Sequence, residues 1–202
     1  MIGYDDIEQG IKDLLAQQQT PRKWPWLATV KSYGGEFDED LLGIVRRFPA
    51  IWVTTAGSDG SPEKLSHNKV KDSVKVVVLV GASSVRNEEA RRHGAGADIG
   101  TYTMLKHVRK LLTNNTLKSV GLAGLDPLEL GKAKTIFNTI VRGQSISVIA
   151  QEFTTGFIFK ASDRDREEED TEAEIQKINI DYYYQPNDGH VDESDLVKLK
   201  EE

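Results

Sequence analysis

Cysteine is absent from this sequence of 202 residues, and methionine occurs only twice. Without cysteine there are no disulfides, thiolate metal ligands or cysteine nucleophiles, so the fold depends on side-chain packing alone. Long apolar runs are also missing, since the longest, Val76–Val80, is far below the ~20 residues that a membrane helix needs. The N-terminal segment Met1–Asp6 is acidic where a signal peptide would be basic, which predicts a protein made and assembled in the cytoplasm.

Charge is distributed unevenly along the chain. Residues 161–202 contain 15 acidic and 5 basic residues, a net charge of −10. Residues 1–160 contain 17 acidic and 21 basic residues, a net charge of +4. A segment as long as residues 1–160 can form one domain with its own core. We therefore divide the chain into an α/β body, residues 1–160, and an acidic C-terminal arm, residues 161–202.

Hydrophobic patterning in the body predicts a fold of the α+β type, with one mixed or antiparallel sheet flanked by helices. Apolar residues at steps of three and four predict helices over residues 4–19, 38–47, 85–93 and 98–113. β-branched and aromatic residues predict strands over residues 27–33, 50–55, 76–80 and 145–160. The continuous apolar run at 76–80 indicates a central strand covered on both faces.

Two regions of the body are less regular. The apolar parity slips at Val148–Ile149, which predicts a β-bulge or bend in the last strand. Residues 117–140 have no clear period, and only a possible strand at 135–141 is suggested there. The helix at 98–113 has the most continuous apolar face, so we expect it to pack across the sheet.

The C-terminal arm resumes a β-like pattern after its acidic run. Residues 161–174 are too charged to bury a surface and are predicted to be a mobile spacer. A possible strand follows at 175–184, and Pro186–Gly189 is a turn signal. We expect this strand to add to a neighbouring protein through the side chains of Ile178, Ile180, Tyr182, Tyr183 and Tyr184.

No pattern in the sequence marks a catalytic site. Gly94–Gly100 resembles a dinucleotide fingerprint, but Ile99 occupies the third glycine position and no strand precedes it, which favours a linker or a helix start. The four histidines lack the spacing of metal ligands. An EF-hand centred on Gly189 would need Tyr184 as its first ligand, which excludes it. We expect no catalytic residue, no metal and no cofactor, and hence a protein that is not an enzyme.

Two clusters of charged and aromatic residues are candidate contact sites. Arg22–Trp26 mixes basic and aromatic side chains, a composition that also stacks bases, but the acidic isoelectric point of about 5.3 argues against sequence-specific nucleic-acid binding. Trp24 and Trp26 are expected to pack on the body or on a partner. Arg86, Arg91 and Arg92 form either a solvated helix face or a patch that meets the acidic arm of another copy.

The order of these segments resembles the tail terminator family of Mu-like contractile-tailed phages. The matching segments are Ile7–Leu15, Phe48–Val53, Val76–Ala82, Arg86–Gly94 and Gly100–Leu112. This resemblance implies a small α/β protein of the virion that forms a hexameric ring, without catalytic residues or cofactors. Its partners would be other copies of itself, the tail tube, the sheath and the head-side connector, close to the DNA channel and away from membranes.

Alternatives to that reading stay open at the level of the sequence. One is another neck or connector protein, or a baseplate-proximal tail protein, with the same α/β body. A different class is a monomeric adaptor that binds a host protein through its acidic tail. The arm and the Arg22–Trp26 segment are not part of the resemblance.

Overall fold

The computed structural model describes residues 2–35, 47–84, 92–95, 98–141, 144–160, 177–182, 191 and 193–198. The chain divides into two compact units, Met1–Ala161 and Ser162–Glu202, and each is described by itself below. The helix predicted at 38–47 lies almost entirely outside the described residues, as does most of the one predicted at 85–93. The same holds for the spacer at 161–174 and the turn at Pro186–Gly189.

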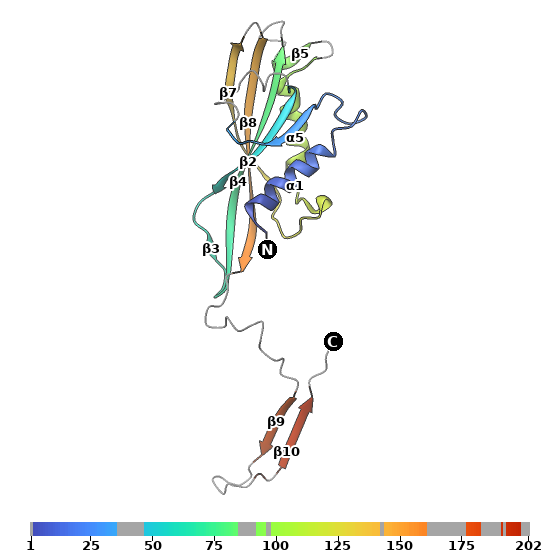
Figure 1. The fold of residues 1–202 in the computed structure, drawn as a ribbon. Helices are drawn as coiled ribbons and strands as arrows, with labels where there is room; N and C mark the ends of the chain where they lie inside the picture. Colours follow the sequence, from blue (N-terminus) through green and yellow to red (C-terminus); the bar gives the residue numbers. More distant parts are fainter. Residues whose placement is uncertain are drawn as a thin grey trace. The chain divides into compact units, whose positions relative to one another are not determined.

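The first unit is built on a mixed sheet of six strands (Figure 1). The strand order in the sheet is β1-β2-β4-β8-β7. The short strand β3 also pairs with β4 but is not part of this order. β1 is parallel to β2, and every later pairing is antiparallel. The strands are β1 (Thr29–Ser32), β2 (Ala50–Ser58), β3 (Glu63–Lys64), β4 (Lys69–Ser84), β7 (Glu129–Val141) and β8 (Gln144–Lys160). The α+β fold with a mixed sheet is confirmed, and β4 is its central strand.

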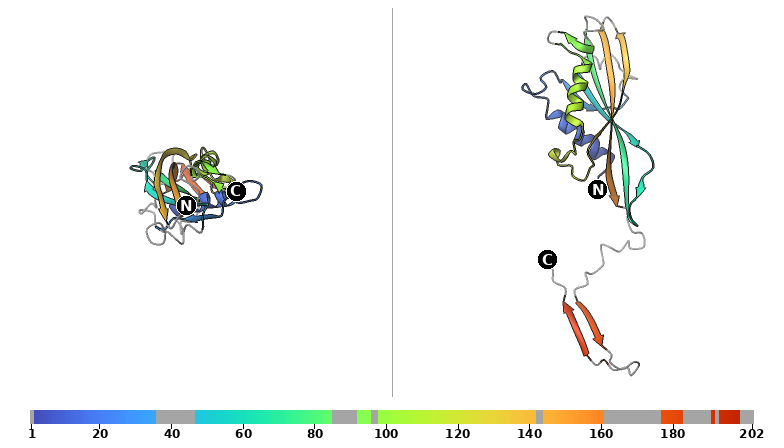
Figure 2. Two further views of the ribbon diagram at one scale, coloured as in Figure 1. Left: turned by 90° about the horizontal axis from the view of Figure 1, so that it is seen from above. Right: turned by 180° about the vertical axis from the view of Figure 1, so that it is seen from behind.

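Two α-helices, α1 (Tyr4–Ala16) and α5 (Thr101–Leu112), cover the same face of the sheet (Figures 1 and 2). A short 3₁₀-helix, η1 (Lys118–Val120), follows α5. A hairpin of two short strands, β5 (Gly94–Ala95) and β6 (Asp98–Ile99), comes before α5. α1 ends at Ala16, three residues before the predicted end. Its last turn tightens there, because the amides of Gln18 and Gln19 donate to carbonyls three residues back.

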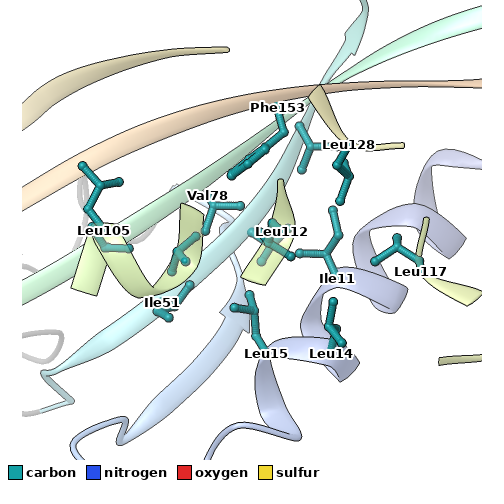
Figure 3. Close-up of a cluster of buried hydrophobic side chains, with 14 of the residues drawn as sticks. Ile11, Leu14, Leu15, Ile51, Val78, Leu105, Leu112, Leu117, Leu128 and Phe153 are labelled. Atoms are coloured by element: carbon teal, nitrogen blue, oxygen red, sulfur yellow. The ribbon is translucent and has the colours of Figure 1, made fainter. Parts of the chain in front are cut away.

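The main hydrophobic core lies between the helices and the sheet (Figure 3). Ile11 and Leu15 reach it from α1, and Leu112 reaches it from α5. They meet side chains of the central strands, including Val78 and Phe153, which are fully buried. Burial of each such side chain stabilises the fold by about 1.5–3 kcal/mol. The amphipathic patterns of the two helices therefore determine which side of each helix packs against the sheet.

A second, smaller cluster lies on the opposite face of the sheet, around Trp52 and Leu79. Phe48 packs edge-on against Trp52, with ring centroids 5.6 Å apart. Ile146 and Val148 of β8 belong to this cluster, whereas Ile149 and Phe153 point into the main core. The parity slip in β8 therefore lies where the strand is covered on both faces.

The bulge predicted within β8 is not found there. The pairing of β8 with β4 runs without a break from Lys160 to Ser145. The irregularity lies in the neighbouring strand β7, where Ile136 is the extra residue between the pairs Thr135↔Ile149 and Phe137↔Val148. β8 is buried on both faces near that point, so a slip in apolar parity needs no extra residue in β8 itself.

The described part of the second unit is an antiparallel hairpin of β9 (Lys177–Tyr182) and β10 (Glu193–Lys198). β9 is the strand predicted at 175–184, and its partner comes from the end of the same chain. Ile180 and Tyr182 of β9 are exposed, as are Leu196 and Val197 of β10. An isolated two-stranded hairpin is only marginally stable in water, so this unit gains stability if it packs on a further surface.

Among the described residues, no helix is long and apolar enough to cross a membrane.

Candidate assembly surfaces

The residues with catalytic or metal-binding potential are dispersed in the described part of the chain. No group of three metal-ligating side chains occurs among the described residues. His107 lies against Trp24 and Trp26, and His93 lies edge-on to Tyr102. Both contacts are aromatic packing.

The glycine-rich segment before α5 contains the β5–β6 hairpin, so α5 begins at Thr101, three residues after the predicted start at 98. Gly100 is the N-cap residue of α5. A Cβ on Gly100 would collide with the carbonyl of Arg92 and the amide of Gly94. Glycine is therefore needed for close backbone packing at the entry to α5. The interpretation as a helix start is confirmed for Gly100 alone, because residues 94–95 and 98–99 pair as strands. Close packing accounts for Gly100 without a phosphate ligand.

The basic-aromatic segment packs on the body. Trp24 is buried, and its ring stacks on Trp26 with centroids 5.2 Å apart and planes 17° apart. His107 of α5 contacts both rings, at 5.7 and 5.9 Å between centroids. The stack connects the loop after α1 to α5. This arrangement confirms that Trp24 packs on the body, and it leaves Trp26 half-buried at the surface.

The interface residues predicted from the sequence are only partly within the described residues. Arg92 is half-buried and engaged in a contact of its own, while Arg86 and Arg91 lie outside the described part. In the arm, Ile180 and Tyr182 alternate along the exposed strand β9. The backbone of Ile178 pairs with Val197 in the hairpin. Tyr183 and Tyr184 lie outside the described residues. Their roles as contact residues stay predictions.

The sheet has two open edges, which sequence reasoning missed. In the part of the chain that the structure describes, no strand pairs with the outer side of β1 or of β7. Figure 1 shows β7 as the outermost strand beyond β8. Every described side chain of β7, from Glu129 to Ile136, is exposed. The alternation Lys132-Ala133-Lys134-Thr135 was a signal for an earlier strand start, but two glycines nearby obscured it.

The edge of β7 is shaped by a buried amide. Gln151 of β8 is fully buried, and its Nε2 donates to the carbonyls of Gly131 at 3.0 Å and Lys132 at 3.3 Å. These two residues form a bulge between Leu130 and Ala133, where the register with β8 shifts. Such a contact satisfies carbonyls that the ladder leaves free. Gln151 thereby fixes the position of the β7 edge relative to the core.

The edge of β1 lies beside a groove formed with α1. One hollow is lined by Gln9, Lys12, Asp13 and Ala16 of α1 and by residues 30–32 of β1. A second hollow shares Gln9 and Lys12 and continues to Thr55 of β2, along the acidic start of α1. Lys12 Nζ donates to Ser32 Oγ at 2.8 Å and holds α1 against β1. The groove is thus bordered by a helix on one side and by a strand edge on the other.

Two ion pairs involve lysines in the first half of β4. Lys75 of β4 pairs with Asp59 at 2.9 Å, and Lys71 pairs with Asp126 at 2.8 Å. The hydrogen bond from Lys75 lowers the pKa of Asp59, and the bond to Asp59 raises the pKa of Lys75. The pKa of Lys71 is raised by its bond to Asp126. These exposed ion pairs hold the loops that contain Asp59 and Asp126 against β4.

Comparison with known proteins identifies the family of this chain. The family model described as "Bacteriophage Mu, Gp37" matches residues 7–158. The match covers most of the body and three-quarters of the chain, so the chain belongs to this family of Mu-like phage tail-related proteins. None of the curated proteins matches the chain. Family membership identifies a structural component of the phage particle, and the acidic arm lies beyond the matched residues.

Proposed function

We propose that this member of the Bacteriophage Mu Gp37 family is a tail terminator, which forms a ring on the tail tube, ends its polymerisation and joins the tail to the head-side connector. The partners of the ring are further copies of this chain, the tail tube and sheath, and the connector. Assembly takes place in the host cytoplasm. The role is one of binding and closure, in keeping with a phage structural family.

The observation that carries this proposal is the pair of open edges on one sheet. β1 and β7 lie at opposite ends of the strand order, so each copy offers two different edges. Exposed edges promote aggregation unless they are covered. When the same contact between two different surfaces is repeated from copy to copy, the copies form a closed ring if the rotation between neighbours adds up to a full turn. A subunit with complementary surfaces at its two ends is suited to that kind of assembly.

The acidic arm supplies a second contact in this proposal. Its hairpin has exposed apolar side chains on both strands and little surface of its own to bury. The net charge of −10 over residues 161–202 favours a basic partner surface. We assign the arm to the contact between the ring and the neighbouring tail or neck component, through strand addition or packing of Ile180 and Tyr182.

Removal of the gene from the phage tests the function directly. We expect particles with tails of uncontrolled length that fail to join heads, and restoration of normal tails when the full chain is supplied. Electron microscopy measures tail length, and labelled antibody against the chain should mark the head-proximal end of the tail. Tails of normal length that join heads without the protein would overturn the terminator function. A label at the baseplate would favour the alternative of a baseplate-proximal protein.

A further inference from the structure

We propose that the β7 edge of one copy adds to the β1 edge of the next copy, in the groove beside α1, so that the sheet continues from subunit to subunit. This inference rests on the proposed ring and names its interface. The occupant of the groove is therefore a second copy of this chain.

The strand directions suit such a contact. β1 runs parallel to β2, and three successive antiparallel pairings lead from β2 to β7, so β7 runs opposite to β1. When copies are related by rotation within a ring, the incoming β7 is antiparallel to β1. Antiparallel pairs form hydrogen bonds perpendicular to the strands and are slightly more stable per residue than parallel pairs. The two edges are thus compatible without any change in the fold.

The β1 edge has backbone groups available for pairing. The amide of Tyr33 donates to the carbonyl of Val53 on the side of β2, in step with the pairing of Ser32 and Val53. Because backbone groups alternate along a strand, the amides and carbonyls of Val30 and Ser32 point away from β2. They face the side on which the groove lies. An incoming strand can satisfy them as a further strand of the sheet would.

Side-chain sizes on β7 suit the space beside α1. The register across the sheet puts Ala133 in line with Ser32, and Thr135 in line with Val30, on the face that the helices cover. Both β7 residues are small, so the strand can approach α1 closely. Lys134 falls on the other face, in line with Lys31. Like charges directly opposite each other are unfavourable, so a staggered register is expected.

Charge is complementary along the rest of the groove. Since the incoming β7 is antiparallel to β1, the residues before Ala133 pass beyond Ser32 toward Thr55. That end of the groove is lined by Asp5, Asp6 and Glu8. The β7 edge carries Lys132, in the bulge beside Ala133. Opposite charges across an interface select the correct partner and orientation.

Two apolar side chains of β7 supply surface to bury. Leu130 is 46% exposed and Ile136 is 48% exposed, and both lie at irregular positions of the edge. Bulges and lysines on an edge strand usually discourage random pairing. The two bulges leave two stretches of β7 in regular pairing, Ala133–Thr135 and Phe137–Val141. The second stretch is longer than β1, which has four residues. The β7 edge therefore favours pairing with a strand that matches its regular stretches over pairing with any exposed strand.

Engineered cysteine pairs test the interface, because the natural chain has no cysteine. Full-length variants combine Lys31→Cys with Lys132→Cys, Lys134→Cys or Ile136→Cys, which samples several registers. Cα atoms of paired antiparallel residues are about 4.5–5.5 Å apart, within the range that a disulfide spans. Each variant is oxidised with diamide and analysed on a non-reducing gel, with light scattering to measure the mass of the native assembly.

We expect at least one pair to give a ladder of covalent multimers that ends at the mass of the ring. The single variants should stay uncrosslinked, because each carries a cysteine on one edge only. Lys31→Cys with Thr103→Cys, on the exposed side of α5, is the matched control and should also stay uncrosslinked.

Three results would overturn the inference. A ring of normal mass in which none of the three pairs crosslinks would exclude this interface and leave the proposed function standing. Dimers from a single variant would indicate contact between two equal edges, as in a two-fold dimer. A chain that stays monomeric both alone and with purified tail tubes would overturn the ring together with its interface.

Discussion

Arg109 Nε of α5 donates a 2.7 Å hydrogen bond to Oε1 of Gln151, a fully buried amide on β8. The amide nitrogen of the same side chain donates to the bulged part of β7. A helix on one face of the sheet is thereby connected to the open edge strand. The position of that edge depends on a polar contact inside the core.

Replacement of Gln151 should destabilise the body and loosen β7. Gln151→Leu keeps the volume but leaves Arg109 and the carbonyls of Gly131 and Lys132 without their partner. Unsatisfied buried groups cost about 1–3 kcal/mol. Thermal unfolding measures the loss, and hydrogen exchange should rise at residues 131–133. Gln9→Leu, which removes an exposed bond to Asp13, is the control and should change stability by less than about 0.5 kcal/mol. Equal losses in the two variants would contradict this account.

The contrast between core and edge can be measured with one type of substitution. Leu112→Ala removes a fully buried side chain and should cost about 2–5 kcal/mol of unfolding free energy. Leu130→Ala removes a largely exposed one and should leave the unfolding of the monomer nearly unchanged while weakening assembly. Denaturant titration and light scattering report the two effects separately. If Leu130→Ala lowered monomer stability as much as Leu112→Ala, its assignment to a contact surface would be wrong.

A charge swap should report on the groove beside α1. Glu8→Lys puts a cation where β7 of the next copy brings Lys132, so assembly should weaken several-fold at low salt. Combination with Lys132→Glu should restore it, because the pair is then reversed rather than lost. Assembly is measured by sedimentation at two salt concentrations. Glu63→Lys, at the exposed strand β3, is the control. A double variant no better than Glu8→Lys would argue against this contact.

The pH response of the body should include the pair of Asp59 and Lys75. Since Lys75 lowers the pKa of Asp59, the stabilisation is present above the unfolded pKa of Asp59 and is lost as pH falls through the lower folded pKa. The effect should be small, because both side chains are accessible to solvent. Lys75→Met should raise the pKa of Asp59 in an NMR titration. Lys71→Met, which removes the partner of Asp126, should leave it unchanged.

The arm and the body should have separable roles. A chain ending at residue 160 keeps both sheet edges and the whole main core, so we expect it to form the ring. It should fail to join tails to heads, because the hairpin of β9 and β10 is gone. Complementation of phage that lack the gene measures the second effect. Truncated protein that restores infectious particles as well as the full chain does would show that the arm has no such role. The full-length variant Ile180→Asp separates loss of the apolar contact from loss of the arm.

Periodicity was a good guide where an element buries one face. The steps of three and four in α1 and α5 identified both helices, since a helix on a sheet buries one stripe of side chains. The continuous apolar run at Val76–Val80 identified the central strand, since that strand is covered on both faces. The strand suggested at 135–141 is confirmed as the second half of β7, whereas the first half, from Glu129, was missed because its side chains are exposed and carry no burial period. The bulge was assigned to β8 because the sequence does not distinguish an extra residue from burial of the strand on both faces.

The sequence by itself determined the α+β class, the absence of disulfides, the two main helices and the resemblance to a phage tail family. Those properties follow from composition and from short-range periodicity, which local sequence encodes. Only the tertiary structure decided the strand order, the parallel placement of β1, and the two edges that remain open. These depend on pairings between residues far apart in the chain, such as Lys31 with Trp52 and Ala150 with Lys134. Pairing of that kind is selected by packing of the whole core, which no local pattern specifies.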